Sequence, residues 1–198
     1  MSREIIFYEN HFIEFYQKQD QKVKEKIIGP TILGLKKDKL DYKGFIFLGL
    51  MNDNGEPKVI EYNCRLGDPE TEVVMPRIKN DLVELLLATA ENRLAGIKIE
   101  TDDRAAATVV AVSGGYPGDY EKGKPIQGLQ TKDLKGSIIF HSRTIQDGQN
   151  VVSNGGRVLA VTSYGSNICT AVKQSNQILE RLNFEGMYHR SDIGYEFY

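Results

Sequence analysis

Oxygen-bearing side chains alternate along residues 58–77, where a strand-forming stretch turns into a polar loop. Val59 and Ile60 are β-branched, which favours a strand. Because successive side chains of a strand point to opposite faces, Glu61 and Asn63 should project from the same face. Mg²⁺ binds oxygen ligands, usually one or two carboxylates together with substrate phosphates. The pattern therefore predicts a divalent-cation site on this strand.

More charged side chains follow the strand. Arg65, Asp68, Glu70 and Glu72 lie within a few residues of Glu61, so one short segment gathers charges of both signs next to an apolar strand. Such a density indicates a binding or catalytic site. The alternative is a solvated hairpin edge whose charges only keep it soluble.

Two motifs in this segment resemble a known family. Glu-Tyr-Asn-Cys-Arg at residues 61–65 resembles the Glu-x-Asn-x-Arg metal strand of ATP-grasp ligases, and Arg-Leu-Gly-Asp-Pro-Glu-Thr-Glu at residues 65–72 is similar to the signature of the phosphoribosylamine-glycine ligase family. The resemblance runs from about Val23 to the C-terminus and includes Arg-Ser-Asp-Ile-Gly-Tyr at residues 190–195.

The resemblance implies an ATP-dependent ligase that joins glycine to 5-phosphoribosylamine in de novo purine synthesis, giving ADP and phosphate. It implies Mg²⁺ or Mn²⁺ as cofactor and ATP as co-substrate. By the same resemblance Glu61 and Asn63 are the metal ligands, Arg65 clamps a phosphate or carboxylate, and Asp68 and Glu70 belong to the catalytic signature.

The preceding strand, residues 44–51, is expected to supply an apolar contact for the adenine from Leu48 or Leu50, because flat nucleobases need apolar walls. Many ATP-grasp relatives carry a second metal-binding carboxylate where this chain has Gly49. With one charged ligand fewer, metal affinity without nucleotide should be weak.

Enzymes of the family are considerably longer, and their N-terminal α/β domain and the triphosphate-covering first half of their ATP-grasp module have no counterpart before Val23. We therefore expect a C-terminal fragment that is inactive alone and self-associates through a face that lacks its partner. Two other functions stay open: another ATP-grasp ligase or carboxylase, or a non-catalytic module that binds a nucleotide or a protein.

Composition excludes several classes of function. The 198 residues carry a net charge of -2 with a pI near 6.0, which gives no basic footprint for nucleic acid or an anionic membrane. Two cysteines, Cys64 and Cys169, are too few for a disulfide framework or a zinc site. The start lacks a signal-peptide pattern, and no apolar run approaches the ~18 residues of a membrane span, so a cytoplasmic protein is expected.

The first half, residues 1–100, should form the metal-binding half of an ATP-grasp module, an antiparallel sheet covered by helices. A helix is expected over residues 23–40, bent or divided at Gly29-Pro30. The Asn-Gly turn within residues 52–57 predicts a hairpin. A helix over residues 82–94, capped by Asn80 or Asp81 and ended by Gly96, should cover the sheet. Residues 1–22 stay unassigned; their aromatic side chains must pack against a neighbour.

The second half, residues 101–198, should form a small antiparallel α+β domain. Strand patterns occupy residues 105–112, 137–145 and 157–164, and a helix with Ser166 as its cap closes the set. Glycine pairs at residues 114–115 and 155–156 have two interpretations: backbone N–H groups that approach a phosphate or carboxylate, or tight turns alone.

Overall fold

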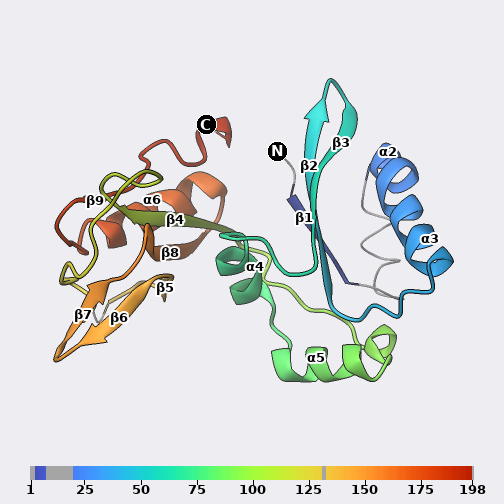
Figure 1. Cartoon of the computed structure of the whole chain (residues 1–198), viewed down its shortest axis with the longest axis horizontal. Helices are drawn as coiled ribbons and strands as arrows, with labels where there is room; N and C mark the ends of the chain where they lie inside the picture. Colours follow the sequence, from blue (N-terminus) through green and yellow to red (C-terminus); the bar gives the residue numbers. More distant parts are fainter. Residues whose placement is uncertain (1–2, 8–19, 131–132, 198) are drawn as a thin grey trace. The chain divides into compact units, whose positions relative to one another are not determined.

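The computed structural model describes residues 3–7, 20–130 and 133–197 (Figure 1). Helices and antiparallel sheets make up these parts, which confirms the α+β class. The aromatic residues between positions 8 and 19, for which we expect a packing partner, lie outside the described residues.

Contacts between Cα atoms divide the chain into two compact units. The first contains residues 1–68 and 78–101, and the second contains residues 69–77 and 102–198. The division into functional domains at residue 100 stays a prediction. The chain therefore passes from the first unit into the second at residues 69–77, which follow the charged loop, and returns to the first unit at residue 78.

The first unit contains a three-stranded antiparallel sheet in the order β1-β2-β3 (Figure 1). Its strands are β1 (Arg3–Phe7), β2 (Phe45–Asp53) and β3 (Glu56–Asn63). The Asn-Gly hairpin is confirmed: Asn54 and Gly55 have φ values of 53° and 84°, and the Gly55 N–H donates to Asn52 Oδ1 at 2.7 Å. Strand β1 has no counterpart among the expected elements.

The helix expected over residues 23–40 is not divided at Gly29-Pro30, and it ends at Lys37. It runs as α2 (Gln21–Val23), a π-helical turn (Lys24–Ile28) and α3 (Gly29–Lys37). A proline inside an α-helix lacks an N–H group, and its ring clashes with the carbonyl four residues earlier. The wider π turn immediately before Pro30 relieves that conflict, so the helix continues.

The core of the first unit lies between this helix and β2. Ile27 and Ile28 pack against Leu48 and Leu50, and all four side chains are at most 3% exposed. The predicted covering helix, α5 (Leu82–Ala90), is capped by Asp81 as expected, but it ends four residues early. Its buried residues pack in a separate cluster with Leu94, so its predicted place over the sheet is wrong: α2 and α3 cover the sheet instead.

A charged triad joins the start of the helix to the hairpin. Glu56 on β3 pairs with Lys22 at 2.5 Å and also with Lys26. Hydrogen bonds from Lys22 and then from Lys26 lower the pKa of the Glu56 carboxyl from its ordinary 4.5 to about 2. Because the pKa falls on folding, the carboxylate stabilises the fold above pH 4.5, and this contribution is lost as the pH falls toward 2.

Glu56→Gln should therefore lower the urea midpoint at pH 6, and the difference from the unchanged chain should vanish near pH 2. Since all three side chains are largely solvated, 1 M salt should also reduce the difference at pH 6. An equal difference at both pH values would show that the triad acts through packing and not through charge.

The second unit contains a four-stranded antiparallel sheet in the order β5-β8-β4-β9. Its strands are β4 (Ala105–Ser113), β5 (Ile138–His141), β8 (Arg157–Gly165) and β9 (Met187–Tyr188). The strand expected over residues 137–145 is divided between β5 and β6 (Thr144–Asp147), and β6 pairs with β7 (Asn150–Ser153) in a separate hairpin.

Helix α6 (Ile168–Leu179) covers one face of this sheet, and its predicted apolar stripe is confirmed by buried residues such as Ala171 and Ile178. The predicted cap, Ser166, is wrong. Asn167 occupies the cap position, with an extended backbone, and its Oδ1 accepts the Thr170 N–H at 2.8 Å.

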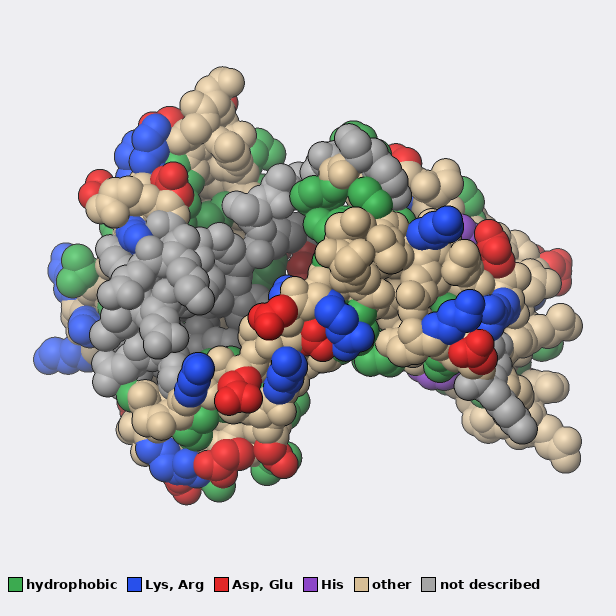
Figure 2. All heavy atoms as spheres, turned by 180° about the vertical axis from the view of Figure 1, so that it is seen from behind, with side chains coloured by type: hydrophobic (Ala, Val, Ile, Leu, Met, Phe, Trp, Pro, Cys, Tyr) green, Lys and Arg blue, Asp and Glu red, His purple; other side chains and the backbone are tan. Residues whose placement is uncertain are grey.

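Acidic and basic side chains alternate over the face that Figure 2 shows, without a continuous basic stripe among the described residues of that face. In the described ranges, no helix combines the length and the apolar character that crossing a bilayer requires.

Candidate functional site

The two predicted metal ligands lie side by side on β3. Asn63 Nδ2 donates to Glu61 Oε1 at 2.9 Å, which confirms that the two side chains share a face. Glu61 pairs with Gly49 and Asn63 pairs with Phe47 on β2, so the side chains of Glu61, Asn63 and Phe47 lie on the face of the sheet opposite the helix-covered core. Glu61 is exposed and Asn63 is half-buried, and the carboxylate is accessible to a cation from solvent.

Gly49 leaves room for the Glu61 side chain. A Cβ atom at Gly49 would lie 2.9 Å from Glu61 Cγ, closer than side-chain carbons normally approach. The register also shifts between Gly49 and Leu50, so a β-bulge lies next to the site. Relatives are expected to carry a second carboxylate at the position of Gly49. In this chain the Glu61 side chain fills the space next to Gly49 that such a side chain would need.

Arg65, Asp68 and Glu70 are placed by the loop that follows β3. Arg65 is exposed, and its Nη1 donates to the Leu66 carbonyl oxygen at 3.1 Å. Asp68 is exposed and is the last residue of this segment in the first unit. Glu70 is half-buried in the second unit, where its carbonyl oxygen accepts the N–H groups of Val73 and Val74 at the start of α4 (Thr71–Arg77). Their catalytic roles stay a prediction.

Helix α4 is anchored on the sheet of the second unit. Thr162 Oγ1 donates to the Glu72 carbonyl oxygen at 2.9 Å, and the Tyr164 hydroxyl donates to the Pro76 carbonyl oxygen at 2.6 Å. Both donors are on β8. The signature segment from Pro69 onward is therefore a fixed part of the second unit.

The predicted adenine contacts, Leu48 and Leu50, lie in the core on the helix-covered face of β2, where they are 1% and 3% exposed. Side chains alternate along β2, so Met51 shares the face of Gly49 and Glu61, and it is 47% exposed. The alternation that places Glu61 beside Asn63 also places Met51 on that face, whereas the sequence analysis names only Leu48 and Leu50 on this strand.

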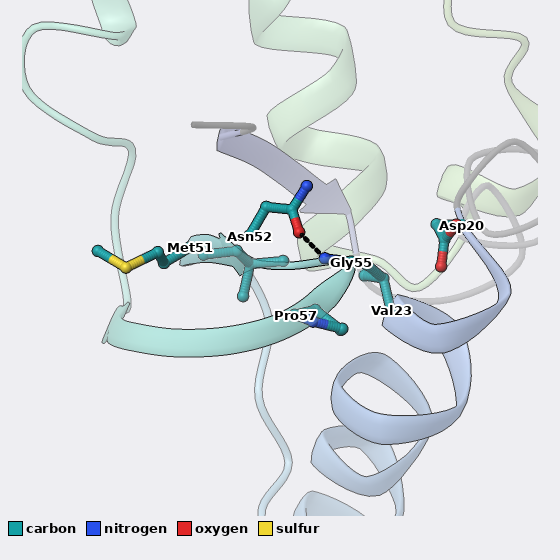
Figure 3. A pocket seen from close by; sticks show the side chains of 7 residues that line it. Asp20, Val23, Met51, Asn52, Gly55 and Pro57 are labelled. Atoms are coloured by element: carbon teal, nitrogen blue, oxygen red, sulfur yellow. Dashed lines mark hydrogen bonds between the residues drawn. The ribbon is translucent and has the colours of Figure 1, made fainter.

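A small cavity opens beside the β2–β3 turn (Figure 3). Its volume is about 170 Å³, and Asp20, Val23, Leu50 and Asn52 are among the residues that line it. Ligand pockets usually measure about 300–1,000 Å³, so this cavity is small for a nucleotide base with its sugar. Leu50 is the one predicted site residue that borders it.

The donor set at Glu61 and Asn63 fits a hard cation, because both residues offer oxygen atoms within one hydrogen-bonded pair. To bind through Oδ1, the Asn63 amide would exchange its hydrogen bond to Glu61 for a metal bond. No group of three or more His, Cys, Asp and Glu side chains suited to a metal occurs within residues 3–7, 20–130 and 133–197.

The glycine pairs of the second unit are packing sites. Ser113 joins the two loops, because its N–H donates to the Gly156 carbonyl oxygen at 2.7 Å and its Oγ donates to that of Gly155 at 2.9 Å. A Cβ atom at Gly156 would lie 2.0 Å from Tyr116 Cδ2, and one at Gly115 would lie 2.0 Å from a backbone oxygen of its own loop. Close packing accounts for these glycines without a bound phosphate.

Two family models match the chain. Residues 12–71 match the ATP-grasp (A) domain of phosphoribosylglycinamide synthetase, and residues 106–196 match the C domain of the same enzyme. The phosphoribosylamine-glycine ligase of Vibrio cholerae is 44% identical over 180 residues, which are 90% of this chain and 42% of that protein.

Two solved structures resemble this chain. A phosphoribosylamine-glycine ligase from Thermotoga maritima superposes with a TM-score of 0.73 and 34% identity over 87% of this chain and 42% of the other. The biotin carboxylase domain of Hydrogenobacter thermophilus 2-oxoglutarate carboxylase has a TM-score of 0.59 at 14% identity, over 86% of this chain and 38% of the other, which shows a shared fold alone. The chain thus spans about two fifths of the length of its curated relatives.

Proposed function

The chain belongs to the phosphoribosylamine-glycine ligase family, and from this premise we propose that it supplies part of a ligase that joins glycine to 5-phosphoribosylamine with ATP cleavage. Residues 1–100 would be the metal-binding half of the ATP-grasp module and residues 101–198 the C-terminal domain. The observation that carries the proposal is the hydrogen-bonded pair of Glu61 and Asn63, within the segment matched by the ATP-grasp model. We place the reaction in cytoplasmic purine biosynthesis.

Each site residue then has a chemical task. Glu61 and Asn63 hold Mg²⁺ or Mn²⁺, which neutralises negative charge on the phosphate oxygens when bound. The exposed guanidinium of Arg65 steadies the transferring phosphoryl group or the glycine carboxylate through charge-assisted hydrogen bonds. Asp68 and Glu70 flank Pro69 and are assigned to the catalytic signature of the family.

The nucleobase contact is assigned to Met51. Leu48 and Leu50 are committed to the core, and a ligand on the Glu61 face meets Met51 before it meets either leucine. A thioether side chain is flexible and polarizable, and it adapts to the flat face of an aromatic ring. Met51→Ala should weaken ATP binding, whereas Leu48→Ala should act first on stability.

The second candidate is another ATP-grasp enzyme, such as a carboxylase. The fold shared with a biotin carboxylase domain is compatible with this candidate. The C-domain match at residues 106–196 favours the glycine ligase over it. A non-catalytic nucleotide- or protein-binding module is the third candidate.

Metal binding tests the proposal directly. Mn²⁺ titrated into the chain should bind weakly without ATP, because one carboxylate and one amide are the only side-chain ligands proposed, and at least about tenfold more tightly with ATP, whose phosphates complete the shell. Glu61→Gln should remove the ATP-dependent part. The change is measured as enhanced water proton relaxation or by calorimetry.

Glu180→Gln is the matched control, since Glu180 is an exposed acid at the end of α6 and is no part of the proposed site. It should bind Mn²⁺ as the unchanged chain does. Tight binding without ATP, or ATP-dependent binding that survives Glu61→Gln, would contradict the assignment.

A further inference from the structure

Helix α4 contains a proline, which removes one of the hydrogen bonds that would close the helix. Pro76 has no N–H group, so it cannot donate to the carbonyl oxygen of Glu72 four residues earlier. The carbonyl group of Pro76 itself lies in the last turn, where helical carbonyl groups have no donor further along the helix. Two carbonyl groups of α4 therefore need donors from outside the helix.

Strand β8 supplies one hydroxyl group to each of these two carbonyl groups. Thr162 Oγ1 donates to the Glu72 carbonyl oxygen at 2.9 Å, and the Tyr164 hydroxyl donates to that of Pro76 at 2.6 Å. Because side chains alternate along a strand, both hydroxyl groups project from the same face of the sheet. We call these two hydroxyl groups the α4 clamp. The clamp matches the two carbonyl groups that a helix with a proline at position 76 cannot satisfy by itself.

Further contacts within the second unit hold the C-terminal end of α4. Arg77 donates from Nε and Nη2 to the Asp102 carbonyl oxygen at 3.2 and 2.9 Å, and the Arg77 carbonyl oxygen accepts the Asp102 N–H at 2.7 Å. The Asp102 carboxylate accepts hydrogen bonds of 2.7–3.2 Å from the Arg104 guanidinium group. That guanidinium group lies 4.2 Å from the centre of the Tyr164 ring. Arg104 therefore restricts the ring whose hydroxyl group reaches α4.

The clamp determines where the beginning of α4 lies. The Glu70 carbonyl oxygen accepts the N–H groups of Val73 and Val74 at 3.0 and 2.9 Å, so Glu70 is joined to the first turn of the helix. Because intrahelical hydrogen bonds join successive turns, an anchor at Glu72 and Pro76 also sets the position of Glu70 relative to the sheet.

We propose that Thr162 and Tyr164 are positioning residues of the ligase reaction, which act through α4 on Glu70. The inference rests on the proposed function for the role of Glu70 in that reaction. Misplacement of a catalytic group by about 1 Å can lower a rate by about 100-fold, so an anchor away from the chemistry can control the rate. The proposed metal ligands belong to the first unit, so binding of metal and ATP should not depend on the clamp.

Hydrogen exchange of the α4 amides in the 198-residue chain, followed by NMR, tests the clamp. Thr162→Val keeps the shape of the side chain and removes the donor, so exchange of the Val74 amide should become about tenfold faster or more. With Pro76→Ala present, the alanine N–H can donate to the Glu72 carbonyl oxygen within the helix, and Thr162→Val should then change the exchange by less than about twofold.

Two controls accompany this comparison. Thr162→Ser keeps the hydroxyl group and should leave the exchange of the α4 amides unchanged. Thr108→Val is the matched control, because Thr108 pairs with Thr162 across the sheet and its hydroxyl group donates to the Val161 carbonyl oxygen at 3.4 Å. It should also leave the exchange of the α4 amides unchanged.

Tyr164→Phe gives a second, opposite comparison. It should also speed the exchange of the α4 amides, but Pro76→Ala should not reverse its effect. The Tyr164 hydroxyl donates to the carbonyl group of residue 76 itself, which alanine keeps and for which it provides no new donor.

The role in the reaction is tested in a ligase in which this chain replaces the matched part of the Vibrio cholerae relative. Thr162→Val should lower kcat about tenfold or more and leave the KM for ATP within about twofold. Adding Pro76→Ala should restore kcat, and Thr162→Ser should keep it. A role in stability alone would not produce this separation of kcat from KM.

An equal effect of Thr162→Val on exchange with and without Pro76→Ala would overturn the inference, as would an unchanged kcat in the active, folded chimera. Circular dichroism checks the fold of each variant, and Tyr164→Phe keeps the test decisive if Thr162→Val unfolds. An unsubstituted chimera without activity would contradict the proposed function, whereas the exchange of the α4 amides decides for or against the clamp independently of that result.

Discussion

The 198-residue chain is expected to release no phosphate when it is given ATP, Mg²⁺, glycine and 5-phosphoribosylamine. The relatives it matches are more than twice as long, and the matched part covers 42% of the Vibrio cholerae ligase. Transfer of a phosphoryl group depends on positioning from several sides of the triphosphate, and this chain supplies one proposed metal pair and one proposed arginine. Phosphate release is measured with a coupled colorimetric assay, and release that requires both glycine and the amine would refute the expectation.

A chimera turns this expectation into a gain of function. In it, this chain replaces the matched part of the Vibrio cholerae ligase, to which it is 44% identical. Phosphate release that depends on glycine and the amine should return. Glu61→Gln in the chimera should then lower the rate by about 100-fold or more, because loss of one preorganised electrostatic contact typically costs that much. Glu180→Gln should leave the rate unchanged, and a folded chimera without activity would contradict the family function.

The features that the sequence predicted well are local ones. The Asn-Gly turn at Asn54 and Gly55 needs only two residues with positive φ, and the alternation that brings Glu61 beside Asn63 needs only an extended backbone. The cap at Asp81 is also local, since one side-chain oxygen reaches N–H groups two and three residues ahead.

The features that it missed depend on which distant elements meet. Nothing in the apolar stripe of α5 distinguishes the sheet from the Leu94 cluster as its partner, and nothing in Arg3–Phe7 specifies pairing with β2. Helix α6 could begin at Ser166 or Asn167, because both side chains can cap, and the backbone angles of the turn decide for Asn167. For the candidate site, the alternation along β2 separates the buried Leu48 and Leu50 from the exposed Met51, but which of these residues contacts a nucleobase stays a prediction.

Gly128→Ala should cause a large loss of stability. Gly128 has a φ of +84°, which an L-residue rarely adopts, and a Cβ atom there would lie 1.9 Å from the Arg181 carbonyl oxygen. The atom in the way belongs to the backbone. The neighbouring Gln127 and Asn183 exchange two backbone hydrogen bonds, at 2.8 and 3.2 Å, that fix the approach.

Neither side of that contact can relax without breaking hydrogen bonds, so we expect a loss of about 3 kcal/mol or more, near the upper end of single-substitution effects. The melting temperature of a domain of this size should fall by roughly 6–12 °C.

Gly34→Ala is the matched control. Gly34 lies inside α3, and a Cβ atom there meets nothing within 4 Å, so alanine should stabilise the helix by up to about 1 kcal/mol. If calorimetry resolves two transitions, the two substitutions should shift different ones, because Gly128 and Gly34 belong to different units. A Gly128→Ala variant that melts with the unchanged chain would show that the loop and the Arg181 backbone separate at little cost.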